Sequence, residues 1–331
     1  MSTTAGTDPL GVALLGATGM WGPRLAEAGR RSGSVRVVTA HARDRERLEE
    51  AAARLGAEPA ATLDAALGHP KVEAVLIVTP NDVHAEQALA AADRGLHAFV
   101  EKPLADTVVA AERVREAFDE AGLVLAVGHE MRRLGAARRA KELVDEGALG
   151  TVVLAEANWS LTSRLSPSAW RWYRDRAPGG PLLQLGIHHA DTLSYLLGPI
   201  VRSSGSFGHV ATEAESDDVG VVTLDFAGGA RGVISGSYVS PRTYFLRLYG
   251  TEGVLEYVGD LSVWPRAEAF DAASTLTLRT ADGAQPVSFT PRDPLAEQLD
   301  EFARCIREGG RPETGGEEGI AALRVIEEAL A

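Results

Sequence analysis

The chain has 331 residues, above the roughly 250–300 at which one hydrophobic core usually divides, so we expect two domains. It carries 33 lysines and arginines against 46 aspartates and glutamates. The resulting net charge of −13 argues against nucleic acid and anionic membrane surfaces as partners. The single cysteine, Cys305, excludes an intramolecular disulfide and a cysteine-rich zinc site. We expect Cys305 to pack inside an amphipathic helix.

No apolar segment approaches the 18 or so residues that a membrane span needs. The N-terminal stretch Met1–Leu10 contains Asp8 and has no basic residue, so we do not interpret it as a signal peptide. These features predict a soluble, cytoplasmic protein. The histidines show no metal-binding spacing, and we predict no metal site.

Short β-rich segments alternate with alanine-rich helical segments up to about residue 130. The predicted strands are Gly11–Leu15, Val35–Ala40, Val72–Thr79, His97–Val100 and Leu123–Gly128. The predicted helices are Pro23–Arg31, Asp44–Leu55, Leu63–Leu67, Val83–Arg94 and Val108–Ala121. Strands that alternate with helices imply parallel crossover connections, so we predict a doubly wound parallel sheet of the Rossmann type.

Strand-like segments follow one another after about residue 150, which predicts a mainly antiparallel, open sheet of five or six strands in an α+β domain. The predicted strands are Val152–Trp159, Val219–Phe226, Gly232–Tyr238, Tyr244–Tyr249 and Val254–Val258. The predicted helices are Ala136–Glu146, Leu182–Leu197, Leu295–Arg307 and Gly316–Leu330. We place the domain boundary between residues 1–128 and residues 129–331, whose C-terminal helices are free to pack back on the first domain.

A glycine motif, Gly16-Ala17-Thr18-Gly19-Met20-Trp21-Gly22, follows the first predicted strand and begins the first predicted helix. Glycines let the backbone turn tightly and approach a pyrophosphate, whose charge is stabilised by the helix N-terminus. The motif in this context predicts a dinucleotide site, although a plain strand–turn–helix connection explains the same glycines.

The end of the second predicted strand bears on the choice of coenzyme. An NAD site usually has a carboxylate about 20 residues after the glycines, whereas an NADP site places an arginine near the 2′-phosphate. Here Ala42 and Arg43 occupy that place, and we interpret Asp44 as the cap of the next helix. We therefore favour NADP(H), with NAD(H) possible; the alternative is that Arg43 and Arg45 are solvated residues at a helix start.

Two further loops follow predicted strands, where ligands bind in open α/β sheets. One is Thr79-Pro80-Asn81, followed by His84, and the other is Glu101-Lys102-Pro103. A lysine at a strand end, flanked by a glutamate and held by a proline, is a candidate proton carrier.

Together these motifs resemble the Gfo/Idh/MocA family of glucose–fructose oxidoreductases and inositol dehydrogenases. The two most specific elements are Glu101-Lys102-Pro103 and Gly186-Ile187-His188, with Asp191 three residues on. The similar segments cover residues 78–81, 95–104, 127–133, 141–150, 169–171, 179–191 and 295–309.

The resemblance implies a Rossmann domain joined to an α/β domain whose large open sheet often forms the oligomer interface. It implies hydride transfer between nicotinamide C4 and a carbon that bears a hydroxyl or ketone, commonly on a sugar, inositol or related polyol. The family's catalytic lysine and histidine map to Lys102 and His188. The family's aspartate maps to Gln184, which cannot carry a proton near neutral pH, so we expect Gln184 to orient substrate.

The remaining predicted site residues lie beside these motifs. Trp170 and Arg171 match a family position near the nicotinamide, with loop packing as the alternative. The predicted coenzyme-binding residues are Gly16, Thr18, Gly19, Met20, Trp21, Arg43, Thr79, Pro80, Asn81, His84, Glu101, Lys102, Trp170 and Arg171. The predicted substrate-binding residues are Lys102, Glu130, Trp172, Tyr173, Gln184 and His188. We choose His188 over the adjacent His189 by motif position, and Asp191 lies where it can orient His188.

We therefore predict an NAD(P)-dependent oxidoreductase acting on a sugar-like alcohol or ketone, with Lys102 as the main acid/base and His188 and Gln184 assisting. Two alternatives stay open. One is a dinucleotide-binding sensor without turnover, and the other is an enzyme that oxidises a sugar transiently to allow elimination. The open sheet suggests a homodimer or homotetramer.

Overall fold

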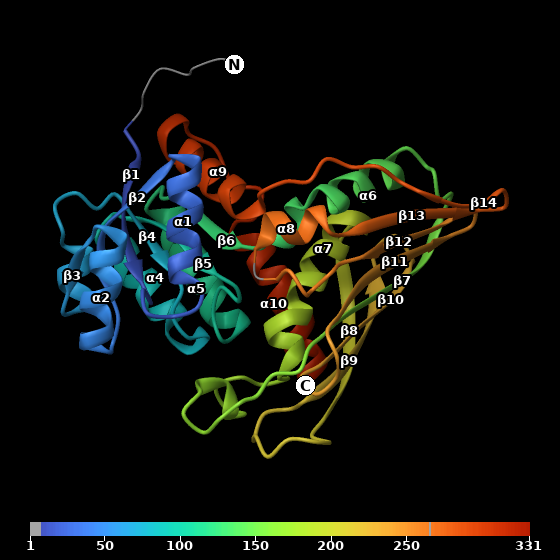
Figure 1. The fold of residues 1–331 in the computed structure, drawn as a ribbon, viewed down its shortest axis with the longest axis horizontal. Coiled ribbons are helices and arrows are strands. Elements are labelled where there is room, and N and C mark those ends of the chain that lie inside the picture. The colour runs from blue at the N-terminus through green and yellow to red at the C-terminus, as the bar shows by residue number, and fades with distance from the viewer. Residues whose placement is uncertain (1–7, 265) are drawn as a thin grey trace. The chain divides into compact units, whose positions relative to one another are not determined.

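The computed structural model describes residues 8–264 and 266–331. Residues 1–7, which the sequence analysis does not interpret as a signal peptide, lie outside the described residues. Contacts divide the chain into two compact units (Figure 1). The first unit comprises the residues up to Gly128 together with Leu295–Glu317. The second unit comprises His129–Pro294 and Glu318–Ala331. No helix in the described ranges has both the length and the hydropathy needed to cross a bilayer.

The first unit is built on a parallel sheet of six strands in the order β3-β2-β1-β4-β5-β6. Its strands are β1 (Leu10–Leu15), β2 (Val35–His41), β3 (Glu58–Ala60), β4 (Ala74–Ile77), β5 (His97–Glu101) and β6 (Leu125–Gly128). Its helices are α1 (Gly22–Ser32), α2 (Arg45–Leu55), α3 (Leu63–Leu67), α4 (His84–Ala92), α5 (Val108–Glu120) and α9 (Pro294–Glu308), of which the first residue belongs to the second unit. The Rossmann arrangement is thus confirmed.

Local sequence explains the elements of this unit. Every residue of β1 is buried, as a strand covered by helices on both faces requires. Asp44 caps α2 by accepting a hydrogen bond from the Arg47 backbone at 3.1 Å, as predicted. Cys305 is buried in α9, also as predicted. The prediction missed β3, because its three residues include Pro59 and two of them are exposed.

The second unit is built on a larger sheet of eight strands in the order β14-β13-β12-β11-β7-β10-β9-β8. Only the pairing of β10 with β7 is parallel. Its strands are β7 (Val152–Ser160), β8 (Ile200–Gly208), β9 (Val219–Phe226), β10 (Arg231–Ser237), β11 (Thr243–Gly250), β12 (Val254–Val258), β13 (Thr275–Thr280) and β14 (Gly283–Pro286). Its helices are α6 (Gly135–Asp145), α7 (Ile187–Leu197), α8 (Ala267–Ala272) and α10 (Gly316–Leu330), of which the first two residues belong to the first unit.

The number of strands predicted for this sheet is wrong. Three of its strands, β8, β13 and β14, were not predicted. The serine-rich β8 and the exposed β14 lack the apolar alternation on which the prediction depends. β13 does alternate, with Leu276 and Leu278 between polar residues, and was overlooked. The helix predicted over Leu182–Leu197 also begins differently: Leu182–Gly186 forms a π-helical turn, and α7 begins at Ile187. A turn of this kind changes which side chains share a face of the helix.

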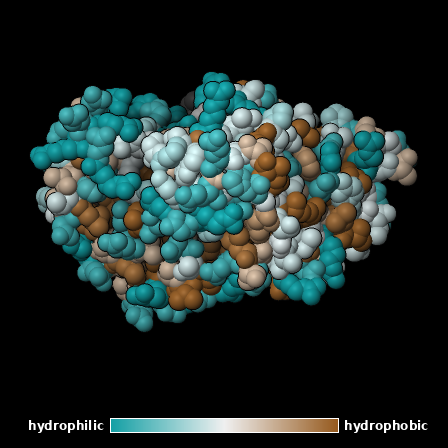
Figure 2. Space-filling view, turned by 90° about the horizontal axis from the view of Figure 1, so that it is seen from below, coloured by the Kyte–Doolittle hydropathy of each residue, from teal (hydrophilic) through white to brown (hydrophobic). Residues whose placement is uncertain are grey.

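One face of the larger sheet is the core of the second unit. On β11 the buried residues Tyr244, Leu246 and Leu248 alternate with residues on the other face that are only half-buried. Helices α6 and α7 contact strands of the sheet (Figure 1). On the molecular face in Figure 2, hydrophobic residues form small groups among hydrophilic ones.

Candidate active site

The glycine turn after β1 has a conformation that only glycine accommodates. Gly16 has φ +94°, and a Cβ placed there would lie 2.7 Å from the Val78 carbonyl oxygen. Helix α1 begins at Gly22 with no side-chain cap and no acidic residue in its first turn. Pro23 has no N–H, and the Arg24 and Leu25 N–H groups donate to the Trp21 carbonyl oxygen. What suits an anion here is the positive end of the helix dipole with no carboxylate beside it.

The loop after β4 adds a polar group to the same edge of the first sheet. Asn81 is buried, and its Nδ2 has no hydrogen-bond partner among the described residues. A buried amide without a partner is costly unless a ligand completes it. The glycine turn, the uncapped helix and this amide together fit a dinucleotide.

His84 ties the two strand-end loops together. Its Nδ1 lies 2.8 Å from the Pro103 carbonyl oxygen, and its Nε2 lies 2.9 Å from the Thr79 carbonyl oxygen. Burial lowers the pKa of His84, so the ring is neutral near pH 7 and donates from one nitrogen only. Both nitrogens face backbone, so His84 holds the loops in place, and its predicted direct contact with coenzyme stays a prediction.

Three arginines lie near the glycine turn in the chain or contact it. Arg43 is exposed at the end of β2, where the sequence predicts it. Arg47 donates from Nη2 to the Thr18 carbonyl oxygen at 3.0 Å, and the Arg24 guanidinium lies 5.1 Å above the Trp21 ring. Neither Arg24 nor Arg47 was predicted, because charged residues in a first helical turn are normally solvated. Met20 is exposed beside them.

Glu101 and Lys102 bury opposite charges in consecutive residues at the end of β5. Their exposed fractions are 4% and 9%. Burial raises the pKa of Glu101 to about 7, and the Lys102 charge opposes this rise. Gly128, at the end of β6, leaves room for the carboxylate, because a Cβ there would lie 2.9 Å from Glu101 Oε1.

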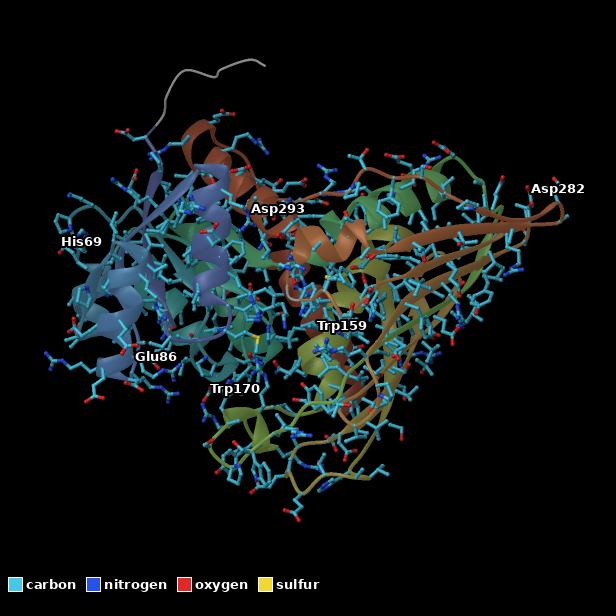
Figure 3. All side chains as sticks on the ribbon, in the orientation of Figure 1. His69, Glu86, Trp159, Trp170, Asp282 and Asp293 are labelled. Atoms are coloured by element: carbon cyan, nitrogen blue, oxygen red, sulfur yellow. The ribbon has the colours of Figure 1, made fainter. Side chains whose placement is uncertain are left out.

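Arg171 and Gln184 meet in the second unit. Arg171 Nε donates to Gln184 Oε1 at 3.3 Å, and its guanidinium lies 4.5 Å over the Trp170 ring. Burial lowers the pKa of Arg171, although the group stays charged near pH 7. The π-helical turn carries Gln184, and the segment that Trp170 marks in Figure 3 carries the arginine.

His188, on the first turn of α7, lies between an aromatic ring and a carboxylate. Its ring is 5.4 Å from the Trp159 ring, which belongs to β7 (Figure 3). Its Nδ1 is 3.7 Å from Glu130 Oε2. Trp159 was not singled out from the sequence, because a tryptophan in a strand indicates core packing and nothing more.

The neighbours of His188 have other partners. His189 lies between the rings of Trp159 and Tyr244, and burial lowers its pKa to about 4, so it is neutral near pH 7. Both Asp191 carboxylate oxygens accept hydrogen bonds from Arg132, at 2.8 Å and 2.5 Å. Asp191 is thus held by Arg132, and its suggested role in orienting His188 stays a prediction.

The predicted substrate wall is only half-buried. Trp172 and Tyr173 lie in the same segment as Trp170, and Tyr173 Oη donates to the Pro167 carbonyl oxygen at 2.9 Å. Ser216 hydrogen-bonds to the backbone of Arg171 and Trp172, which fixes this segment to the rest of the second unit. Aromatic faces and forked donors of this kind suit the C–H surfaces and hydroxyls of sugars.

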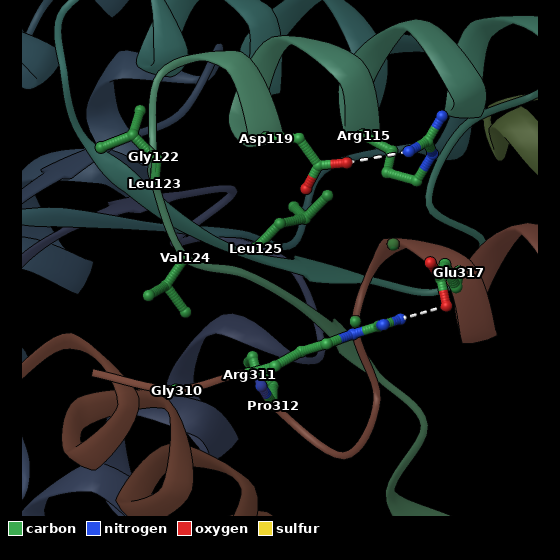
Figure 4. A pocket seen from close by; sticks show the side chains of 12 residues that line it. Arg115, Asp119, Gly122, Leu123, Val124, Leu125, Gly310, Arg311, Pro312 and Glu317 are labelled. Atoms are coloured by element: carbon green, nitrogen blue, oxygen red, sulfur yellow. Dashed lines mark hydrogen bonds and ion pairs between the residues drawn. The ribbon is translucent and has the colours of Figure 1, made fainter. Parts of the chain in front are cut away.

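A separate pocket of about 250 Å³ in the first unit is not the coenzyme site (Figure 4). It lies beside Leu123–Leu125, where β6 begins, whereas the glycine turn and the Glu101-Lys102 loop follow the carboxyl ends of strands. Its arginines are already paired, Arg115 with Asp119 at 2.8 Å and Arg311 with Glu317 at 2.7 Å.

The fold and these residues define a Rossmann-type oxidoreductase with a second, sheet-based unit. Residues 10–129 match the oxidoreductase family with an NAD-binding Rossmann fold, and residues 137–256 match the GFO/IDH/MocA C-terminal domain. The chain belongs to the GFO/IDH/MocA family of oxidoreductases.

Two relatives show the range of the family. The chain is 32% identical over 265 residues to 1,5-anhydro-D-fructose reductase of Ensifer adhaerens, covering 78% of this chain and 76% of that protein. It is 31% identical over 291 residues to D-xylose 1-dehydrogenase (NADP(+)) 2 of Haloferax volcanii, covering 86% of each. A solved structure described as a putative NADPH-dependent oxidoreductase from Desulfitobacterium hafniense is 34% identical, with a TM-score of 0.93 and coverage of 98% of this chain and 95% of that one.

The raised pKa of Glu101 predicts a pH dependence of stability. A folded-state pKa of about 7, above the ordinary 4.5, means that the protonated carboxyl stabilises the fold below about pH 4.5. This contribution is lost as the pH rises through about 7. Glu101→Gln removes the titration, so its urea midpoint, relative to wild type, should be higher at about pH 8 than at about pH 5. The exposed Glu120→Gln is the matched control, and parallel curves for E101Q and wild type would contradict the assignment.

Proposed function

We propose that this protein is an NADP(H)-dependent oxidoreductase that interconverts an alcohol and a ketone on a sugar-like substrate. The observation that carries the proposal is the buried Glu101-Lys102 pair at a strand end of a Rossmann unit. Relatives named for reduction of 1,5-anhydro-D-fructose and oxidation of D-xylose support a sugar-like substrate. We assign dinucleotide binding to the first unit and substrate binding to the second.

The chemistry needs one proton carrier on the protein. A bound nicotinamide supplies or accepts the hydride at C4. In the reductive direction Lys102 gives a proton to the substrate oxygen as the ketone becomes an alcohol, and in the oxidative direction it takes that proton back. Ionised Glu101 stabilises the ammonium form of Lys102 before the transfer.

Gln184 and His188 act on the substrate without replacing Lys102. The Gln184 amide accepts a hydrogen bond from Arg171 and, with no titratable proton, positions hydroxyl groups. His188, on α7, assists Lys102 by acting on the substrate. The half-buried Trp172 and Tyr173 form part of the wall against which the sugar packs.

The oxidoreductase proposal predicts a catalytic defect in Lys102→Met. The variant should lose about 10²–10⁴-fold in kcat because no other group takes over the proton, while NADPH should still bind. We would follow nicotinamide absorbance with a panel of sugars, inositols and keto-sugars, and measure NADPH binding by calorimetry. The exposed lysine variant Lys71→Met is the control.

Near-normal turnover of K102M would contradict the mechanism. A wild-type protein that binds NADPH tightly but turns over no member of the panel would instead indicate a dinucleotide-binding sensor. Coenzyme that stays bound and returns to its starting form in each cycle would indicate transient oxidation of the sugar.

The preference for NADP(H) is tested at Arg43. A guanidinium on the 2′-phosphate contributes about 1.5–3 kcal/mol, so Arg43→Ala should raise the KM for NADPH by roughly 10–100-fold and leave the KM for NADH unchanged. Arg45→Ala, an exposed arginine two residues on, is the matched control. Equal losses with both coenzymes, or no loss, would overturn the assignment.

We further propose a cytoplasmic homodimer or homotetramer that forms through the uncovered face of the second sheet. Half-buried and exposed apolar residues lie on this face, among them Leu154, Val221, Phe245 and Val258. They surround an ion pair between Arg247 and Glu256. Apolar area with a few paired charges is typical of an interface between copies of one chain.

A further inference from the structure

His188 faces a carboxylate that comes from a different part of the second unit. Glu130 lies in the short turn Glu130–Arg133 after β6, and its Oε2 is 3.7 Å from His188 Nδ1. Both side chains are buried, with exposed fractions of 1% and 3%. An electrostatic interaction this far from water is screened little by salt.

Aromatic rings around the Glu130–His188 pair limit its access to water. The Trp159 ring covers one side of His188, and the His129 ring lies 6.2 Å away and nearly perpendicular to it. A carboxylate in such surroundings is costly unless a positive or hydrogen-bonding group compensates it. His188 offers Glu130 such a group at 3.7 Å.

Asp191, His129, His189 and Tyr244 are titratable groups close to the pair. Asp191 on α7 is held by Arg132, and His129 Nδ1 lies 3.9 Å from the same Asp191 carboxylate. His189, also on α7, is neutral near pH 7 because of its burial. Tyr244 on β11 interacts electrostatically with Glu130, and burial raises the pKa of its hydroxyl, so it adds no charge.

We propose that Glu130 is a positioning residue for His188, and that it supplies from the turn after β6 the carboxylate that position 184 lacks. This inference rests on the proposed oxidoreductase function. A carboxylate beside Nδ1 keeps a proton on that nitrogen and fixes the ring. Nε2 is then the nitrogen left to exchange a hydrogen bond or a proton with a substrate oxygen, while Gln184 remains a neutral hydroxyl-binding group.

The pairing is tested without turnover by NMR of the full-length protein labelled at histidine Cε1. The His188 signal is assigned by its loss in His188→Gln. Removing the facing charge in Glu130→Gln should move the His188 titration midpoint to lower pH by about one unit, and Glu130→Asp should restore most of the shift. Glu142→Gln, an exposed carboxylate on α6, is the control.

An unchanged His188 titration in E130Q, with the other histidine signals in their wild-type positions, would overturn the proposal. If E130Q also disturbs the other histidine signals, the test depends on E130D. A His188 titration midpoint in E130D that differs from the wild-type midpoint would then overturn the pairing. Because this readout needs neither substrate nor coenzyme, it stays valid if the proposed enzymatic function fails.

Kinetics test the same pairing in the working enzyme. E130Q should lower kcat about 10–100-fold and shift the pH profile of kcat, with the KM for NADPH unchanged. Combining E130Q with H188Q should cost little more than H188Q alone, because the two residues act as one unit. Fully additive losses would show that Glu130 acts independently of His188 and would overturn the proposal.

Discussion

The desolvation of charge is the constraint on which the described sites depend. A charged group buried without a partner costs several kcal/mol, so a buried charge needs an opposite charge or hydrogen bonds nearby. In the first unit Glu101 and Lys102 occupy consecutive positions at the end of β5. In the second unit Arg132 holds Asp191 with two hydrogen bonds, and Glu130 faces His188.

The two sheets position these charged residues. Parallel strands have all their carboxyl ends at one edge of the sheet. The glycine turn and the loops after β4 and β5 therefore lie at the same edge, although they are far apart in the sequence. His84 then joins two of those loops through backbone carbonyls. The second sheet has a different role, because its inner face carries Trp159, against which the His188 ring packs.

The sequence predicts what local pattern encodes. Alternating strands and helices, the turn at Gly16 and the cap at Asp44 are all short-range signals, and the structure confirms the elements they indicate. β8 and β14 carry no apolar alternation, so they were missed, whereas the short β13 was missed although it alternates. The pairing of Glu130 with His188 joins residues far apart in sequence, and no periodicity reports such a contact. The roles of the predicted site residues remain predictions.

Hydride transfer itself is most directly tested with NADPH deuterated at C4. The labelled coenzyme is incubated with wild-type protein and a pool of keto-sugars, and the products are read by mass spectrometry and NMR. We predict one deuterium on the new carbinol carbon, from only one of the two C4 stereoisomers of the label. Products that form without deuterium from either stereoisomer, or no reduction of any member of the pool, would contradict it.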